Sequence, residues 1–318
     1  MVNIAVAGGS GNVGRTIIET LKQQTAHKAF NLTRNTSKSD VGVPNIEVDY
    51  TNVDSIRNGL ERNDIHTVIS CLSYEGDTLA VSQNNLISAA ALSSATKRLI
   101  PSTFGVHYPE EYVLPITAPS AANKELPTLV DYFGAIDRLK ASGLQWTVVE
   151  NGCFMDYWGQ PHIKTYLRPS LFGLDIAARE AAIPGDGNDR FSLTYTWDVA
   201  KFVVALQDLD EWPEVSRFAG DIITWNEFVR IAEEATGVTF KVTHDSVEDL
   251  EKSKMTELPS QIPCYKFIPK EQFQWFLSIF SRWTTRPEIS HIPAEMNHLF
   301  PDIKPLTVRE MVNKYWKA

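Results

Sequence analysis

The chain has 318 residues, which allows one large domain or two, and its 43% hydrophobic and 22% charged residues are ordinary for a globular protein. The formal net charge of −9 disfavours nucleic acid or an anionic membrane surface as a partner, although a local basic pocket for phosphates remains compatible with it. No run of about 18 apolar residues is present and the N-terminus lacks the features of a secretory signal, so we expect neither a membrane span nor secretion. Three widely spaced cysteines fit neither a disulfide framework nor a metal site, which favours a reduced, cytoplasmic setting without a metal.

The chain starts with a short apolar run that leads into a glycine-rich turn. Val2–Ala7 is typical of a buried strand, and residues 15–21 have helical spacing. The glycines between them fit both G-x-x-G-x-x-G and G-x-G-x-x-G. A strand, a glycine turn and a helix in this order let the backbone approach a pyrophosphate and direct the helix N-terminus at it. We therefore expect the whole turn to bind a dinucleotide; its residues are Gly8, Gly9, Ser10, Gly11, Asn12, Val13 and Gly14.

Short apolar runs then alternate with helical stretches through the first half of the chain. Strands are expected at Lys28–Thr33, Ile46–Val48, Thr67–Cys71, Arg98–Ile100 and Trp146–Glu150. Helices are expected from a capping box at 51–54, over 78–93, and over 126–142 with Gly143 as the stop. This alternation predicts an α/β fold with a Rossmann-type, doubly wound parallel sheet.

The pattern changes after Asn151. Residues 154–190 are rich in aromatic residues, proline and glycine, 190–197 alternate like a strand, and 198–207 are helical. Capping boxes are expected at 224–227 and 307–310, and 246–300 look helical and aromatic. We predict an NADP-binding Rossmann domain over 1–153 and a smaller, mostly helical substrate domain over 154–318 that closes over the carboxyl ends of the sheet. Within the second half, 190–207 are expected to return to the Rossmann sheet.

The end of the second expected strand decides which nicotinamide cofactor is bound. An acid at this position binds the ribose 2′-hydroxyl of NAD, whereas a basic residue accepts the 2′-phosphate of NADP. Arg34 and Lys38 supply positive charge here, Asn35 and Ser37 supply hydrogen-bond donors, and no acid occurs before Asp40. The donor fork of arginine matches phosphate geometry. The sequence therefore predicts NADP(H), bound through Arg34, Asn35 and Lys38.

Several separated motifs resemble the NmrA-like and isoflavone-reductase-like branch of the atypical short-chain dehydrogenases, most closely its fungal members. The motifs are the glycine turn, Arg34, Pro101–Gly105, Trp146–Val149 through Asn151–Phe154, Gly220–Glu227 and Phe300–Asp302. The resemblance implies a Rossmann domain that binds NADP(H) and a small C-terminal substrate domain. Members of this branch include reductases of phenolic and polyketide-like natural products, and other members bind the dinucleotide as a regulatory signal.

Two residues are candidates for proton transfer. The Tyr-x-x-x-Lys pair of ordinary short-chain dehydrogenases is absent, since no tyrosine has a lysine four residues later. The resemblance implies a lysine about eleven residues before the glycine that ends the helix ahead of the sixth strand. Counting back from Gly143 gives Tyr132, and Lys124 is the nearest upstream lysine. Lys124 with a lowered pKa, or Tyr132 through its phenol, is the expected acid or base.

Further cofactor contacts are expected where strands end at the same edge of the sheet. Cys71 and Leu72 follow the fourth strand and are expected beside the cofactor ribose. The loop after the fifth strand contributes Ser102, Thr103 and Phe104, with His107 as a further acid–base candidate. The remaining contacts expected after the sixth strand are Asn151, Cys153 and Phe154.

An aromatic substrate pocket is one interpretation of the stretch after the sixth strand. Phe154–Trp158, together with Phe172 and Trp197, would suit an aromatic or largely apolar small molecule. The alternative interpretation is that these rings form ordinary core.

Three functions are compatible with these patterns. The first is an NADPH-dependent oxidoreductase that reduces a small, largely apolar natural product in secondary metabolism. The second is an NADP-sensing regulator that binds a partner protein without turnover. The third is an NADP-binding cyclase or isomerase. The sequence leaves the substrate, the bond reduced and the oligomeric state open.

Overall fold

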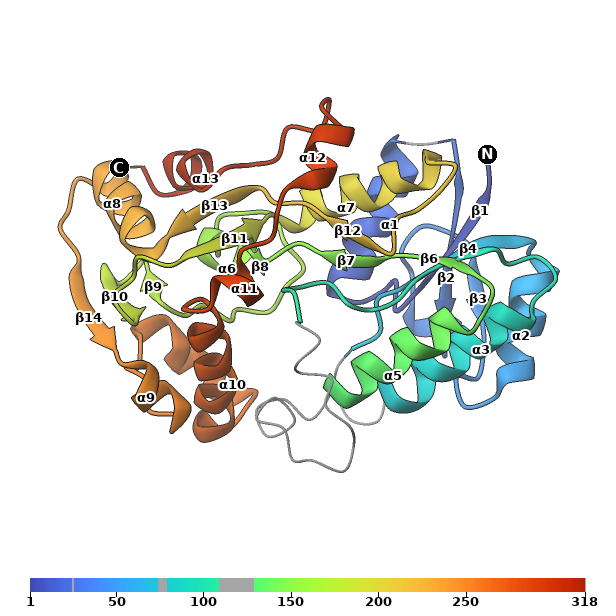
Figure 1. Ribbon diagram of the computed structural model, residues 1–318, viewed down its shortest axis with the longest axis horizontal. Helices are drawn as coiled ribbons and strands as arrows, with labels where there is room; N and C mark the ends of the chain where they lie inside the picture. The colour runs from blue at the N-terminus through green and yellow to red at the C-terminus, as the bar shows by residue number, and fades with distance from the viewer. Residues whose placement is uncertain (25, 74–78, 109–128, 318) are drawn as a thin grey trace. The chain divides into compact units, whose positions relative to one another are not determined.

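The computed structural model describes residues 1–24, 26–73, 79–108 and 129–317 (Figure 1). The chain divides into two compact units. Unit 1 comprises Met1–Phe104, Pro109–Glu150 and Ala200–Ser216. Unit 2 comprises Gly105–Tyr108, Asn151–Val199 and Arg217–Ala318.

Unit 1 is built on a six-stranded parallel sheet with the order β3-β2-β1-β4-β5-β6. The strands are β1 (Asn3–Ala7), β2 (Lys28–Thr33), β3 (Asn45–Glu47), β4 (Ile65–Ser70), β5 (Arg98–Ile100) and β6 (Gln145–Trp146). This order reverses between β1 and β4, as in Rossmann folds, so the carboxyl ends of these two strands flank the position where such sheets bind ligands. The predicted fold class is confirmed.

Helices cover both faces of this sheet. They are α1 (Asn12–Gln24), α2 (Val53–Arg62), α3 (Asn84–Leu92) and α5 (Leu129–Lys140), with short turns η1 (Thr36–Lys38) and η3 (Leu79–Gln83). Figure 1 shows α2, α3 and α5 on one face and α1 on the other. Right-handed crossovers explain this, because the chain moves one way from β1 to β3 and the opposite way from β3 to β6. Between the helical layers, Ile4–Ala7 of β1 are fully buried.

Two details of unit 1 differ from expectation. The N-cap of α2 is Asn52 rather than Thr51, because the Asn52 side chain accepts a hydrogen bond from Ser55 N–H at 3.1 Å while the Thr51 hydroxyl donates to Asp49. The expected sixth strand is two strands, because after β6 the chain continues as β7 (Val148–Glu150), which pairs with β12 (Val215–Arg217) instead of the six-stranded sheet.

Unit 2 contains two three-stranded sheets and several helices. One sheet has the order β14-β10-β9 and the other β13-β11-β8. The strands are β8 (Cys153–Phe154), β9 (Leu174–Asp175), β10 (Glu180–Pro184), β11 (Arg190–Thr194), β13 (Asp221–Thr224) and β14 (Lys241–Asp245). The helical segments are α6 (Asp156–Gly159), α8 (Trp225–Thr236), α9 (Val247–Glu251), η6 (Pro259–Lys266), α10 (Lys270–Trp283), α11 (Pro287–Ser290), α12 (Glu295–Leu299) and α13 (Val308–Tyr315).

The expected return of residues 190–207 to the Rossmann sheet is wrong for the strand. β11 pairs with β13 on one side and with β8 on the other. In the pairing with β8, Leu193 and Thr194 lie opposite Cys153 and Phe154. Helix α7 (Thr196–Ala205) and turn η5 (Leu206–Asp208) follow, and the boundary between the units falls within α7.

Local signals for helix ends are confirmed in unit 2. Thr224 and Glu227 form a reciprocal capping box at the start of α8, and Thr307 and Glu310 do the same for α13. Gly237 ends α8 with a φ of 68°, a left-handed conformation that favours glycine.

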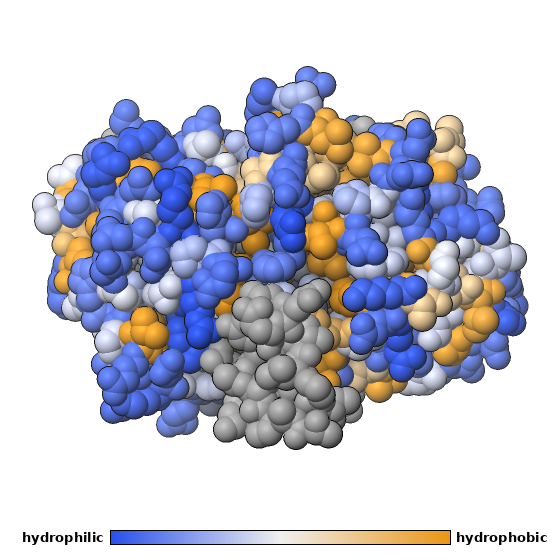
Figure 2. All heavy atoms as spheres, viewed as in Figure 1, coloured by the Kyte–Doolittle hydropathy of each residue, from blue (hydrophilic) through white to orange (hydrophobic). Residues whose placement is uncertain are grey.

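The surface seen in Figure 2 is mainly hydrophilic, with apolar side chains in small separate groups. No helix within the described part of the chain is long and apolar enough to cross a membrane.

Candidate functional site

The glycine turn joins the carboxyl end of β1 to the start of α1. Gly11 N–H donates to the Gly8 carbonyl at 2.9 Å, and α1 begins at Asn12 with no acid in its first turn. Ser10, Gly11 and Asn12 are exposed. The first N–H groups of a helix have no partner within the helix, so this exposed turn offers donors and a partial positive charge to an anion.

Three glycines leave no room for a side chain beneath this turn. Gly8 has a φ of 75°, and a Cβ there would lie 2.6 Å from the Cys71 carbonyl oxygen. A Cβ at Gly14 would lie 2.5 Å from the Gly8 carbonyl oxygen, and one at Gly9 would overlap Ile18. These contacts with backbone and core hold the turn in a shape that only glycine permits, as close approach to a pyrophosphate requires.

Asn31 is a residue of this region that the sequence analysis missed. It lies in β2, is fully buried, and donates from Nδ2 to Asn45 Oδ1 at 2.7 Å. Its own Oδ1 has no hydrogen-bond partner among the described residues and lies 2.6 Å from where a Gly9 Cβ would be. The available signal was a lone amide inside the apolar run Lys28–Thr33.

The basic loop after β2 presents Arg34 to solvent. Its guanidinium forms no hydrogen bond or ion pair with any residue that the structure describes. Asn35 caps η1, and its Oδ1 accepts hydrogen bonds from Ser37 N–H at 3.0 Å and from the Ser37 hydroxyl at 2.7 Å. Lys38 is the last residue of η1. Glu47 contacts this loop, where its carboxylate accepts from the Thr36 hydroxyl at 3.0 Å.

The loops after β4 and β5 meet at the carboxyl edge of the sheet. Cys71 N–H donates to the Ala7 carbonyl at 2.8 Å, so the chain after β4 stays beside the glycine turn. The Ser102 hydroxyl donates to the Leu72 carbonyl at 2.8 Å. Burial raises the pKa of the Cys71 thiol, so this thiol stays protonated and is a packing group rather than a nucleophile.

The rest of the β5 loop is largely buried. Thr103 is 2% exposed, and its hydroxyl donates to the Pro101 carbonyl and accepts from Val149 N–H, both at 3.4 Å. Phe104 is half-buried. Direct contacts within unit 1 therefore join the loops after β4 and β5 to the glycine turn: Cys71 contacts Gly8, and Ser102 contacts Leu72.

The expected contacts after β7 belong to unit 2. Asn151 is fully buried, its backbone N–H donates to the Gly105 carbonyl at 2.8 Å, and its Nδ2 donates to the Gly152 carbonyl at 2.9 Å. Burial raises the pKa of the Cys153 thiol to about 12. Phe154 is half-buried, with its ring 6.4 Å from that of Tyr157. Their role in cofactor binding stays a prediction.

The two proton-transfer candidates differ in what the structure describes. Lys124 lies outside the described residues. Tyr132 is 6% exposed and lies on the buried face of α5 with Leu129 and Leu139, its ring 5.0 Å from that of Phe133. This burial favours a packing role, and catalysis by either residue stays a prediction. His107 is half-buried, and its backbone N–H donates to the Ile289 carbonyl at 3.0 Å.

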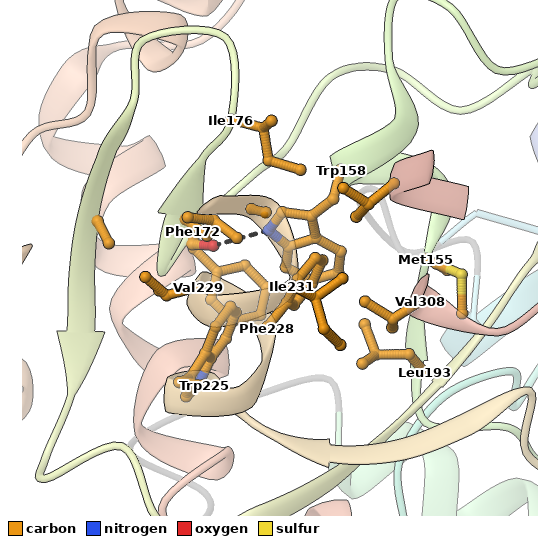
Figure 3. Close-up of a cluster of buried hydrophobic side chains, with 14 of the residues drawn as sticks. Met155, Trp158, Phe172, Ile176, Leu193, Trp225, Phe228, Val229, Ile231 and Val308 are labelled. Atoms are coloured by element: carbon orange, nitrogen blue, oxygen red, sulfur yellow. Dashed lines mark hydrogen bonds between the residues drawn. The ribbon is translucent and has the colours of Figure 1, made fainter. Parts of the chain in front are cut away.

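The expected aromatic pocket is mostly core. Trp158 and Phe172 are each 2% exposed, and the Trp158 indole N–H donates to the Phe172 carbonyl at 3.1 Å. Figure 3 shows both side chains packed with Trp225 and Phe228. These buried rings contact one another within the hydrophobic core of unit 2, so the pocket prediction is wrong for Trp158 and Phe172.

Three of the expected pocket residues are only half-buried: Phe154, Tyr157 and Trp197. At Trp197 the Lys164 ammonium lies 3.8 Å from the ring centroid.

Comparison with known proteins decides the family. A family model described as NAD(P)H-binding matches residues 8–208. The chain is 33% identical over 308 residues to Oxidoreductase BOA1 of Botryotinia fuckeliana (strain B05.10), with 96% of each chain covered. This chain belongs to the NAD(P)H-binding family.

More distant matches in the family agree with the resemblance drawn from the motifs. The chain is 25% identical to Isoflavone reductase homolog A622 of Nicotiana glauca, with 98% of this chain and 97% of the relative covered. A binary complex of leucoanthocyanidin reductase with NADPH from Vitis vinifera has the same fold, with a TM-score of 0.68, 19% identity and coverage of 98% and 99%. The isoflavone-reductase-like assignment is confirmed, and the chain is an NAD(P)H-binding oxidoreductase.

The residues present fit this cofactor. The turn of unit 1 combines exposed helix N–H groups with glycines whose missing side chains leave the backbone accessible. A dinucleotide held there would meet the turn through its pyrophosphate.

Proposed function

We propose that this protein is an NADPH-dependent reductase of a small, largely apolar natural product in secondary metabolism. The family supplies the oxidoreductase class, and the names of similar proteins, which include leucoanthocyanidin reductase and isoflavone reductase, support a small organic substrate. When bound, NADPH supplies the hydride for the reduction.

The observation that carries the preference for NADPH over NADH is the exposed Arg34 guanidinium directly after β2. It has no carboxylate partner among the residues described, and β2 ends without an acid. An arginine at this strand end pairs with a 2′-phosphate, whereas an acid would repel it. The Nδ2 of Asn35, which donates to no residue in the described part of the chain, is a second donor, since its Oδ1 is already used by Ser37.

The role of the protein in the reaction is orientation and exclusion of water. The glycine turn would fix the pyrophosphate, and the loops that carry Leu72 and Ser102 would position the other half of the cofactor. The predicted acid or base for the accompanying proton is Lys124, which lies outside the described residues, or Tyr132.

Replacing Arg34 tests the cofactor preference. Arg34→Ala is expected to weaken NADPH binding by about tenfold or more, because a charge-assisted hydrogen bond is lost, while NADH binding changes little. Arg62→Ala, at an exposed position in the last turn of α2, is the matched control. Calorimetric titration with both cofactors gives the ratio of affinities. An unchanged ratio in Arg34→Ala would show that Arg34 does not select NADPH.

Turnover separates the reductase from the sensor and isomerase alternatives. The native protein is expected to consume NADPH in proportion to a reduced product when pinoresinol, isoflavones and related compounds are offered, with absorbance and mass spectrometry as readouts. A product that forms without NADPH consumption would favour the cyclase or isomerase. Binding of NADP(H) without any turnover, together with recovery of a partner protein, would favour the regulator.

A further inference from the structure

A buried glutamine joins two loops at the carboxyl edge of the sheet. Gln83 ends the π-helical turn η3 and is 1% exposed. Its Oε1 accepts a hydrogen bond from Ser102 N–H at 2.8 Å and another from the Ser70 hydroxyl at 3.0 Å. Ser70 ends β4, and Ser102 lies two residues after β5. One side-chain oxygen therefore links the ends of two adjacent strands.

The same link continues to the glycine turn. The Ser102 hydroxyl donates to the Leu72 carbonyl at 2.8 Å, and the preceding residue, Cys71, packs its carbonyl group against Gly8. A π-helical turn is a rare backbone form that often marks functional sites. Here it directs the buried Gln83 amide at the backbone N–H of Ser102 and at the side-chain hydroxyl of Ser70.

The position of these loops says which half of the cofactor they face. In this strand order the ligand crosses from the β2 side to the β4 and β5 side of the switch point. Arg34 follows β2, which assigns the adenosine half to that side. The loops joined by Gln83 follow β4 and β5, on the other side of the switch point, and therefore face the nicotinamide half.

We propose that Gln83 is a positioning residue for the nicotinamide half of NADP(H), acting through Ser102 and Leu72. This proposal rests on the proposed function, since it requires that NADP(H) occupies the switch point. Gln83 is too buried to contact the cofactor itself, so its effect is the fixed spacing of the two loops.

Gln83→Met tests the proposal, because methionine is close in size and has no strong acceptor. The Ser102 N–H and the Ser70 hydroxyl then lose this acceptor, so the side-chain link between the β5 loop and the end of β4 is lost. NADPH affinity is expected to fall by about tenfold. Affinity for 2′,5′-ADP, which lacks the nicotinamide half, is expected to stay unchanged. Calorimetry with both ligands and thermal unfolding of each variant provide the readouts.

Gln83→Glu is the rescue variant, because a glutamate keeps an oxygen at the accepting position whether or not it is protonated, and NADPH affinity should return with it. If Gln83→Met does not fold, Gln83→Asn, which keeps the amide but is shorter, provides the same comparison. Equal losses for both ligands, or no loss for either, would overturn the positioning role. A native protein that binds neither ligand would instead overturn the proposed function.

Discussion

At the scale of single residues, the glycines of the turn are the most demanding positions in unit 1. Gly14 and Gly134 both lie in helices, α1 and α5, yet their surroundings differ. A Cβ at Gly14 would lie 2.5 Å from the Gly8 carbonyl oxygen, whereas one at Gly134 would meet nothing within 4 Å. The two positions therefore separate the general cost of glycine in a helix from the specific need for glycine in the turn.

Gly14→Ala is expected to abolish measurable NADP⁺ binding, because the added methyl group pushes the Gly8 carbonyl out of the turn. Gly134→Ala is expected to leave binding unchanged and to raise the free energy of unfolding by about 0.5–1 kcal/mol, the usual gain of alanine over glycine in a helix. Calorimetry and denaturant unfolding measure both. Normal binding by Gly14→Ala would place the pyrophosphate elsewhere.

The sequence identified residues whose chemistry is visible in a short motif and missed residues whose role depends on distant partners. The glycine turn and Arg34 follow from local pattern, because a strand, a turn and a helix are consecutive in the chain. Asn31 is a single amide between apolar residues and Gln83 is one of four consecutive polar residues, so neither stands out in the sequence, and only the fold shows that Gln83 contacts Ser102.

At the scale of elements, the same distinction holds. The capping boxes of α8 and α13 are confirmed because both partners lie within four residues. Strands β9, β10 and β14 were not expected, since β10 is only five residues long and pairs with β14, about 60 residues further on. The split of β6 from β7 likewise depends on the pairing of β7 with β12, which lies about 65 residues further along the chain and has no local sequence signal.

The start of α7 carries a pH-sensitive contact. Asp156 is fully buried, and its carboxylate accepts hydrogen bonds from Thr196 N–H at 2.9 Å and from the Thr196 hydroxyl at 2.6 Å. Burial nevertheless raises the pKa of Asp156 to about 6, against the opposing hydrogen bonds from Thr165 and Thr196. Between about pH 4 and about pH 6, the folded state therefore holds a proton on Asp156 that the unfolded state has already released.

The free energy of unfolding is expected to fall as the pH rises from about 4 to about 6, by up to about 3 kcal/mol from this group, and to level off above that range. The sign follows because the folded protein binds more protons than the unfolded chain in this window. Asp156→Asn should lose this component, whereas Asp302→Asn, at an exposed turn, should keep it. Denaturant unfolding between pH 4 and 8 measures the slopes; identical slopes in the native protein and Asp156→Asn would refute the assignment.

At the scale of the whole molecule, the chain passes between the two units several times. Ala200–Ser216 belong to unit 1, although the segments before and after them, Asn151–Val199 and Arg217–Ala318, belong to unit 2. The predicted single domain boundary after residue 153 does not describe this arrangement. Composition changes once along the sequence, whereas successive segments of the chain alternate between the two units. The assignment of cofactor binding to the first domain and substrate binding to the second stays a prediction.

The net charge of −9 also belongs to this scale. A negative surface repels a dinucleotide with several phosphates at long range, so binding has to come from local donors. The helix N-terminus after the glycine turn and the exposed Arg34 are two groups in unit 1 that meet this need.

A crystal structure of the protein with bound NADP⁺ tests this account most directly. The account predicts the pyrophosphate against Gly11, Asn12 and Val13 at the start of α1, with the 2′-phosphate within hydrogen-bond distance of the Arg34 guanidinium. A dinucleotide bound away from this turn, or a 2′-phosphate that faces solvent with Arg34 unengaged, would contradict it.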